Sequence, residues 1–214
     1  MKKLLILLLS FAVFTGCAGD KPDENIESGQ NEVSTVPSDV GTMAEPADAL
    51  IRCMLENDVK YDPSDEMFFW KAVYYFAGMY APMHGLSEVA EDGSMTLPRQ
   101  TVQEFATVLF ADYDDLLPLP EEMSENVVYS EETDAYTFYV GDRGLSETVI
   151  TDFADNGDGT FSMTAQLRGV EENDLICEGK FIITVNEYAD GISRPIYFYS
   201  VVSAEINGHK HDNF

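Results

Sequence analysis

The pattern of apolar and polar residues divides the chain into a helical part followed by an extended part. In the helical part, apolar residues recur at intervals of three and four, which predicts helices over residues 47–57, 67–81 and 97–109. The second helix is apolar on nearly every side, with Lys71 as its one clearly polar residue, and such a helix is expected to be buried in a core. The alternative is that its aromatic residues line a cavity for an apolar or sugar ligand. Residues 87–95 are expected to form an acidic loop between the second and third helices.

From residue 127 onward, apolar and polar residues alternate with a period of two, as they do in half-buried strands. This pattern predicts five strands and a shorter sixth at 127–129. The five strands cover residues 135–140, 147–155, 160–168, 176–188 and 196–206. Asn156-Gly157 and Asp158-Gly159 are strong hairpin signals between the second and third strands, and the other connections are short. We therefore expect an antiparallel meander with one solvent-facing side.

These elements predict the α+β class, with about three N-terminal helices packed on one face of an antiparallel meander of five or six strands. The order of helices and strands is similar to that of cystatin-like and NTF2-like folds. This resemblance concerns architecture alone, since no residue motif carries it.

The start of the chain carries the most specific signal in the sequence. Lys2 and Lys3 precede an apolar run over residues 4–14, and Thr15-Gly16-Cys17 follows directly. At 1.5 Å per residue the run would span about 17 Å, well short of the ~30 Å hydrocarbon core of a bilayer. It is therefore typical of a cleaved export signal and not of a permanent transmembrane helix.

The cysteine at the end of this signal resembles the lipobox of bacterial lipoproteins. The resemblance implies that residues 1–16 are removed and that the Cys17 sulfur carries a diacylglyceryl group on the new amino terminus. The alternative is an ordinary secretory signal that happens to be cut beside a cysteine. We expect a protein held on the extracytoplasmic face of a cell membrane by the lipid on Cys17.

A polar segment separates this signal from the helical pattern. Residues 18–46 contain seven acidic side chains, one lysine and no aromatic residue. So little apolar surface cannot offset the entropy of ordering the chain. We expect a disordered acidic linker over residues 17–46 and a single α+β domain over residues 47–214.

The charge of the protein limits its partners. The formal net charge is −27, and removal of Lys2 and Lys3 would leave 10 basic against 39 acidic side chains, a charge of −29. Such a chain repels nucleic-acid phosphates and anionic lipid headgroups, so membrane attachment would depend on the acyl chains. The acidity favours solubility at the cell surface, with binding of cations or basic ligands as the alternative.

Two cysteines remain if Cys17 is lipidated. Cys53 and Cys177 would form an even pair in an oxidising compartment and could be joined by a disulfide. They could equally be buried free thiols, which pack as small apolar side chains.

No recognisable catalytic or metal-binding motif occurs in the sequence. There is no Gly-x-Ser-x-Gly elbow and no glycine-rich phosphate loop, and pairs of carboxylates carry no information among 39 acids. Asp152, Asp155 and Asp158 lack the spacing of a calcium-binding EF-hand loop. His209 and His211, with Asp212, could hold a metal only with a further ligand from elsewhere. We therefore predict no cofactor and no metal.

Tyrosines on the sheet are the remaining candidates for a binding surface. One side of the meander is expected to face the helices; its residues are Phe138, Phe181, Ile183, Phe198 and Val202. Tyr139, Tyr188, Tyr197 and Tyr199 would then point to solvent, where amphipathic rings suit a glycan or protein partner. The alternative is that these tyrosines simply have high strand propensity and pack across strands.

Taken together, the sequence favours a non-catalytic binding or interaction module on a lipid anchor. The alternatives are an extracytoplasmic hydrolase that uses carboxylates and a structural component of the cell envelope.

Overall fold

The computed structural model describes residues 37–140, 144–171, 173–189 and 197–208, and these form an α+β structure, as predicted. The helical elements are η1 (Val40–Met43), α1 (Ala44–Asn57), α2 (Glu66–Tyr80), α3 (Arg99–Leu109) and η2 (Glu121–Met123). The strands are β1 (Ser94–Pro98), β2 (Val127–Ser130), β3 (Ala135–Tyr139), β4 (Ser146–Asp155), β5 (Thr160–Gly169), β6 (Leu175–Val185) and β7 (Tyr199–Asn207).

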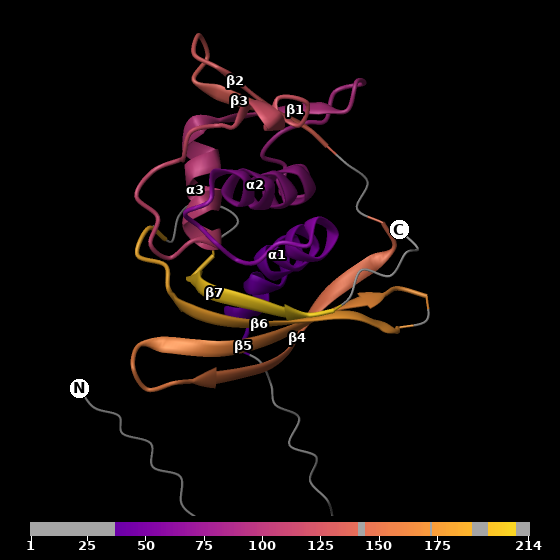
Figure 1. Ribbon diagram of the computed structural model, residues 1–214, viewed down its shortest axis with the longest axis vertical. Coiled ribbons are helices and arrows are strands. Elements are labelled where there is room, and N and C mark those ends of the chain that lie inside the picture. Colours follow the sequence, from indigo (N-terminus) through magenta and orange to yellow (C-terminus); the bar gives the residue numbers. More distant parts are fainter. Residues whose placement is uncertain (1–36, 141–143, 172, 190–196, 209–214) are drawn as a thin grey trace, which may run out of the picture. The chain divides into compact units, whose positions relative to one another are not determined.

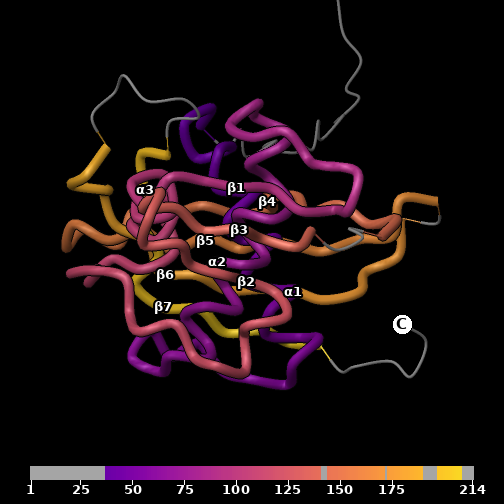
Figure 2. The backbone as a smooth tube through the Cα atoms, turned by 90° about the horizontal axis from the view of Figure 1, so that it is seen from above, coloured from indigo at the N-terminus to yellow at the C-terminus, as the bar shows by residue number. Residues whose placement is uncertain are grey.

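The strands form two antiparallel sheets with the three α-helices between them (Figure 1). The larger sheet is a meander in the order β4-β5-β6-β7, and the smaller one has the order β1-β3-β2. α1 packs on the larger sheet, whereas α2 packs on α1 and on β3. Seen from above, the small sheet overlies α2 (Figure 2). The meander thus has four strands instead of five or six, because β2 and β3 pair with β1 on the far side of the helices.

β1 occupies residues that we expected to form a loop and the start of a helix. Met95 and Leu97 point inward from this strand and are buried, while Thr96 between them is exposed. Two apolar positions are too few to establish a period of two. The strand forms because Met95 pairs with Phe138 and Leu97 with Tyr136, residues about forty positions further along the chain.

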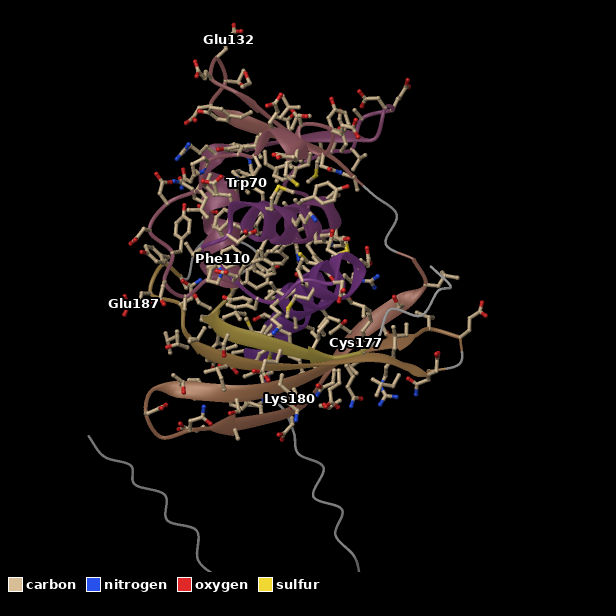
Figure 3. All side chains as sticks on the ribbon, viewed as in Figure 1. Trp70, Phe110, Glu132, Cys177, Lys180 and Glu187 are labelled. Atoms are coloured by element: carbon tan, nitrogen blue, oxygen red, sulfur yellow. The ribbon has the colours of Figure 1, made fainter. Side chains whose placement is uncertain are left out.

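The nearly continuous apolar surface of α2 is explained by its position between α1 and the small sheet. Asp65 caps the helix by accepting a hydrogen bond from the Phe68 amide at 2.7 Å. Trp70 is fully buried, and its indole nitrogen donates to the carbonyls of Leu117 and Pro118 at 2.9 and 3.0 Å. Figure 3 shows Trp70 and Phe110 in the interior beside the helices. The prediction that this helix is buried is confirmed.

The predicted disordered linker is wrong for residues 37–46. η1 and the first turn of α1 occupy this segment, and Val40 and Met43 are fully buried in the core. Isolated apolar residues in a polar stretch suggested disorder. These two residues, however, lie on one side of a short helix, and the burial of their apolar side chains stabilises the segment. Residues 1–36, which include Cys17, lie outside the described part of the chain.

Candidate functional site

Two of the four candidate tyrosines are buried, so the predicted tyrosine surface is wrong. Tyr197 and Tyr199 are only 6% and 9% exposed, whereas the intervening Phe198 is 42% exposed. The Tyr197 hydroxyl donates to Glu45 Oε2 at 2.5 Å, and the Tyr199 hydroxyl donates to Asp39 Oδ2 at 3.0 Å. Burial and the neighbouring carboxylates raise the pKa of both tyrosines, so both hydroxyls remain hydrogen-bond donors.

A β-bulge accounts for the inverted face of β7. Val201 pairs with the inward-facing Ile183, but the register shifts at the next position, so that Phe181 pairs with Ala204. Val202 is the extra residue and is exposed. A shift of one residue moves every side chain to the opposite face of a sheet, and alternation along the sequence cannot reveal where it occurs.

The other two tyrosines are exposed but lie far apart in the fold. Tyr139, 40% exposed, is on β3 of the small sheet, and Tyr188, 61% exposed, follows β6 of the larger sheet. The Tyr188 hydroxyl donates to the Tyr113 carbonyl at 3.1 Å. The four tyrosines therefore do not form a common surface.

Cys53 and Cys177 are buried free thiols, and the proposed disulfide between them is absent. The Cys53 thiol is near Lys71 and Tyr75, so it faces α2. Cys177, on β6 (Figure 3), packs against Gly208. Burial raises the pKa of Cys53 to about 12 and that of Cys177 to about 11, which keeps both thiols protonated and unreactive.

His209, His211 and Asp212 lie outside the described residues.

A buried carboxylate joins three elements of the domain. Asp48 on α1 has no exposed surface and accepts hydrogen bonds from three side chains. Its Oδ2 accepts from Arg52 Nε at 2.9 Å and from the Tyr80 hydroxyl at 2.8 Å, and its Oδ1 accepts from the Thr148 hydroxyl at 2.7 Å. Arg52 Nη2 also donates to the Ser146 hydroxyl at 2.7 Å. Because Asp48 is closed off from solvent, we assign this cluster a structural role linking α1, α2 and β4.

A pocket of about 310 Å³ opens between α1 and α2, next to this cluster. Its lining residues are Arg52, Glu56, Tyr74, Tyr75, Gly78, Met79 and Asn126. Residues at i and i+4 share a face of a helix, so Arg52 and Glu56 of α1 lie together, as do Tyr74 and Gly78 of α2. Asn126, directly before β2, completes the pocket. Its volume is at the small end of the range for ligand sites.

Gly78 forms an open part of the pocket wall. It is buried within α2, yet a Cβ atom placed on it would have no atom within 4 Å other than those of its chain neighbours and the backbone of α2 itself. Its backbone is helical, so no left-handed conformation requires a glycine at this position. A glycine inside a helix costs about 0.5–1 kcal/mol relative to alanine. Neither packing nor backbone conformation explains that cost, and the effect of the glycine is to keep the pocket open.

A hydrogen-bonded tyrosine–carboxylate pair lies in the pocket. The Tyr75 hydroxyl donates to Glu56 Oε2 at 2.5 Å. Burial, followed by the bond to Glu56, raises the pKa of Tyr75, so the phenol stays protonated. A tyrosine nucleophile would need the opposite shift, because the phenolate is the attacking species.

A second hollow, of about 320 Å³, lies on the outer face of the larger sheet, where Figure 3 shows Lys180 pointing away from the helices. Met163 and Phe181 contribute to its lining but turn their side chains into the core. Polar side chains such as Lys180 and Glu205 surround it. It lacks the side-chain walls of the α1–α2 pocket, which is therefore the better candidate site.

The sequence suggested a cavity at the aromatic residues of α2 only as an alternative to core packing. It did not identify the α1–α2 pocket or its lining, although one signal for the pocket was present. Gly78 is an isolated glycine within a strong helical pattern, and such a glycine usually has a packing or functional reason. The other lining residues come from three separate segments, and only the fold brings these together.

Comparisons of the chain with protein-family models, curated proteins and solved structures gave no match. In the described part of the chain, no helix combines the length and apolar character needed to cross a bilayer.

Proposed function

We propose that this protein is a lipid-anchored, extracytoplasmic binding protein that holds a small ligand in the α1–α2 pocket. The lipid anchor is supported by the lipobox-like sequence ending at Cys17. The binding role is supported above all by Gly78, a helical glycine whose missing side chain leaves the pocket open. The Tyr75 hydroxyl, whose proton is donated to Glu56, can accept a hydrogen bond from a ligand, and Asn126 offers a carboxamide beside it.

Lipidation can be tested by phase partitioning of the full chain expressed in a bacterial host that processes lipoproteins. The wild-type protein is expected in the detergent phase, with an acyl mass on Cys17, because two or more acyl chains anchor a protein stably. Cys17→Ser is expected in the aqueous phase, and Cys177→Ser is the matched control that should still partition into detergent. Wild-type protein in the aqueous phase without an acyl mass would contradict the anchor.

The pocket can be tested by filling it from α2. Gly78→Leu places a side chain in the open space and is expected to fold normally, since leucine favours a helix more than glycine does. Gly41→Leu is the matched control, because Gly41 is exposed and also has open space beside it. Ligand-observed NMR would compare both variants with the wild type, using a panel of neutral hexoses, hexuronic acids, hexosamines, phenylalanine and benzamide.

At least one compound of this panel is expected to bind the wild type and Gly41→Leu, with binding lost in Gly78→Leu. Absence of binding to the wild type by the whole panel, or binding that survives in Gly78→Leu, would refute a ligand role for the pocket. The fold of each variant can be checked by circular dichroism and thermal unfolding.

A further inference from the structure

We infer that the α1–α2 pocket takes a single uncharged sugar ring, an inference that rests on the binding role proposed above. A sugar ring presents an apolar C–H face and a rim of hydroxyl groups. The pocket presents matching surfaces from two sides, and its size and the pairing of its charges suit one uncharged ring.

The apolar surface comes from one face of α2. Tyr74, Gly78 and Met79 stand within about one turn of each other on this helix and all line the pocket. The rings of Tyr74 and Tyr75 are nearly perpendicular, at 88°, with centroids 5.9 Å apart, so they form a corner. The Tyr74 hydroxyl donates to the Tyr139 carbonyl at 2.7 Å, which holds its ring in place. A fixed aromatic surface beside an open glycine suits the C–H face of a ring.

The polar surface includes a side chain without a hydrogen-bond partner among the described residues. Asn126 is half-buried, and its carboxamide makes no hydrogen bond to any residue in the described part of the chain. A carboxamide offers both donors and an acceptor, and a sugar hydroxyl can satisfy either kind. A half-buried amide of this sort is therefore best matched by a ligand with several hydroxyl groups.

The charges around the pocket favour an uncharged ligand. Arg52 and Glu56 contribute one charge of each sign to the lining. Both charges already have partners, since Arg52 is paired with the buried Asp48 and Glu56 accepts the Tyr75 hydroxyl. A charged ligand would therefore lose hydration without finding an unpartnered counter-charge in the lining. A volume of about 310 Å³ is large enough for one sugar ring.

The test compares sugars that share a ring and differ in charge. Titrations of the wild-type protein would use glucose, galactose and mannose, together with the corresponding uronic acids and hexosamines. At least one neutral hexose is expected to bind about tenfold or more tightly than both of its charged analogues. Asn126→Ala is expected to weaken that binding about three- to tenfold, the loss of one neutral hydrogen bond. Asn207→Ala, at the exposed end of β7, is the matched control and should leave affinity unchanged.

Three results would overturn the inference. Charged analogues could bind as tightly as the neutral hexose, or Asn126→Ala could leave sugar affinity unchanged. Alternatively, no sugar could bind while benzamide or phenylalanine binds in a way that Gly78→Leu abolishes. In this last case the binding role of the pocket would stand and only the ligand class would be wrong, whereas failure of the whole panel would refute both.

Discussion

Asp48→Ala is expected to lower the free energy of unfolding by about 3–5 kcal/mol, the usual cost of removing one partner from a buried ion pair. The substitution leaves the Arg52 guanidinium without its buried carboxylate partner. It also deprives the Tyr80 and Thr148 hydroxyls of their common acceptor. Urea denaturation at neutral pH, followed by circular dichroism, measures the change directly.

A double variant separates the cost of unpaired charge from the loss of packing. Asp48→Ala combined with Arg52→Met removes both charges, and it is expected to be more stable than Asp48→Ala alone. This follows because an apolar replacement of a whole buried pair is often neutral or stabilising. A loss below about 1 kcal/mol in Asp48→Ala would mean that the cluster is open to water.

Tyr197→Ala is expected to destabilise the fold by about 3–5 kcal/mol, as the truncation of large buried aromatic side chains does. The Tyr197 ring packs edge-on against Phe76, with centroids 5.4 Å apart, and its hydroxyl donates to Glu45. The variant loses both contacts and leaves a cavity beside α2. Thermal and urea unfolding of the variant measure the loss.

Tyr188→Ala is the matched control for this prediction. Tyr188 is 61% exposed, and its hydroxyl donates to the Tyr113 carbonyl at 3.1 Å, so a change of at most about 1 kcal/mol is expected. Equal and small effects in the two variants would contradict the assignment of Tyr197 to the buried face of β7.

Local patterns predicted most of the elements correctly. The continuous apolar surface of residues 67–81 indicated a buried helix, and the structure places α2 between α1 and the small sheet. The alternation over residues 160–168 predicted β5, in which the alternate residues Met163, Ala165 and Leu167 are buried. The hairpin signal before it is also confirmed, with Gly157 and Gly159 at φ values of 78° and 91°.

The errors occurred where structure depends on contacts between distant segments. Alternation alone placed Phe198 and Val202 in the core, whereas the bulge in the β6–β7 register buries Tyr197, Tyr199 and Val201. β1 was missed because its stability comes from pairing with β3. Val40 and Met43 were assigned to a linker because their apolar partners lie elsewhere in the chain.

The sequence by itself determined the α+β class, the three helices, six of the strands and the acidic character of the protein. It also carries the lipobox-like signal on which the proposed anchor rests. These features follow from periodicity, composition and short motifs, which are properties of neighbouring residues. Only the tertiary structure decided the division into two sheets, the buried face of β7 and the pocket beside Gly78. These depend on pairing and packing between segments that are far apart in the chain, and no local pattern encodes such contacts.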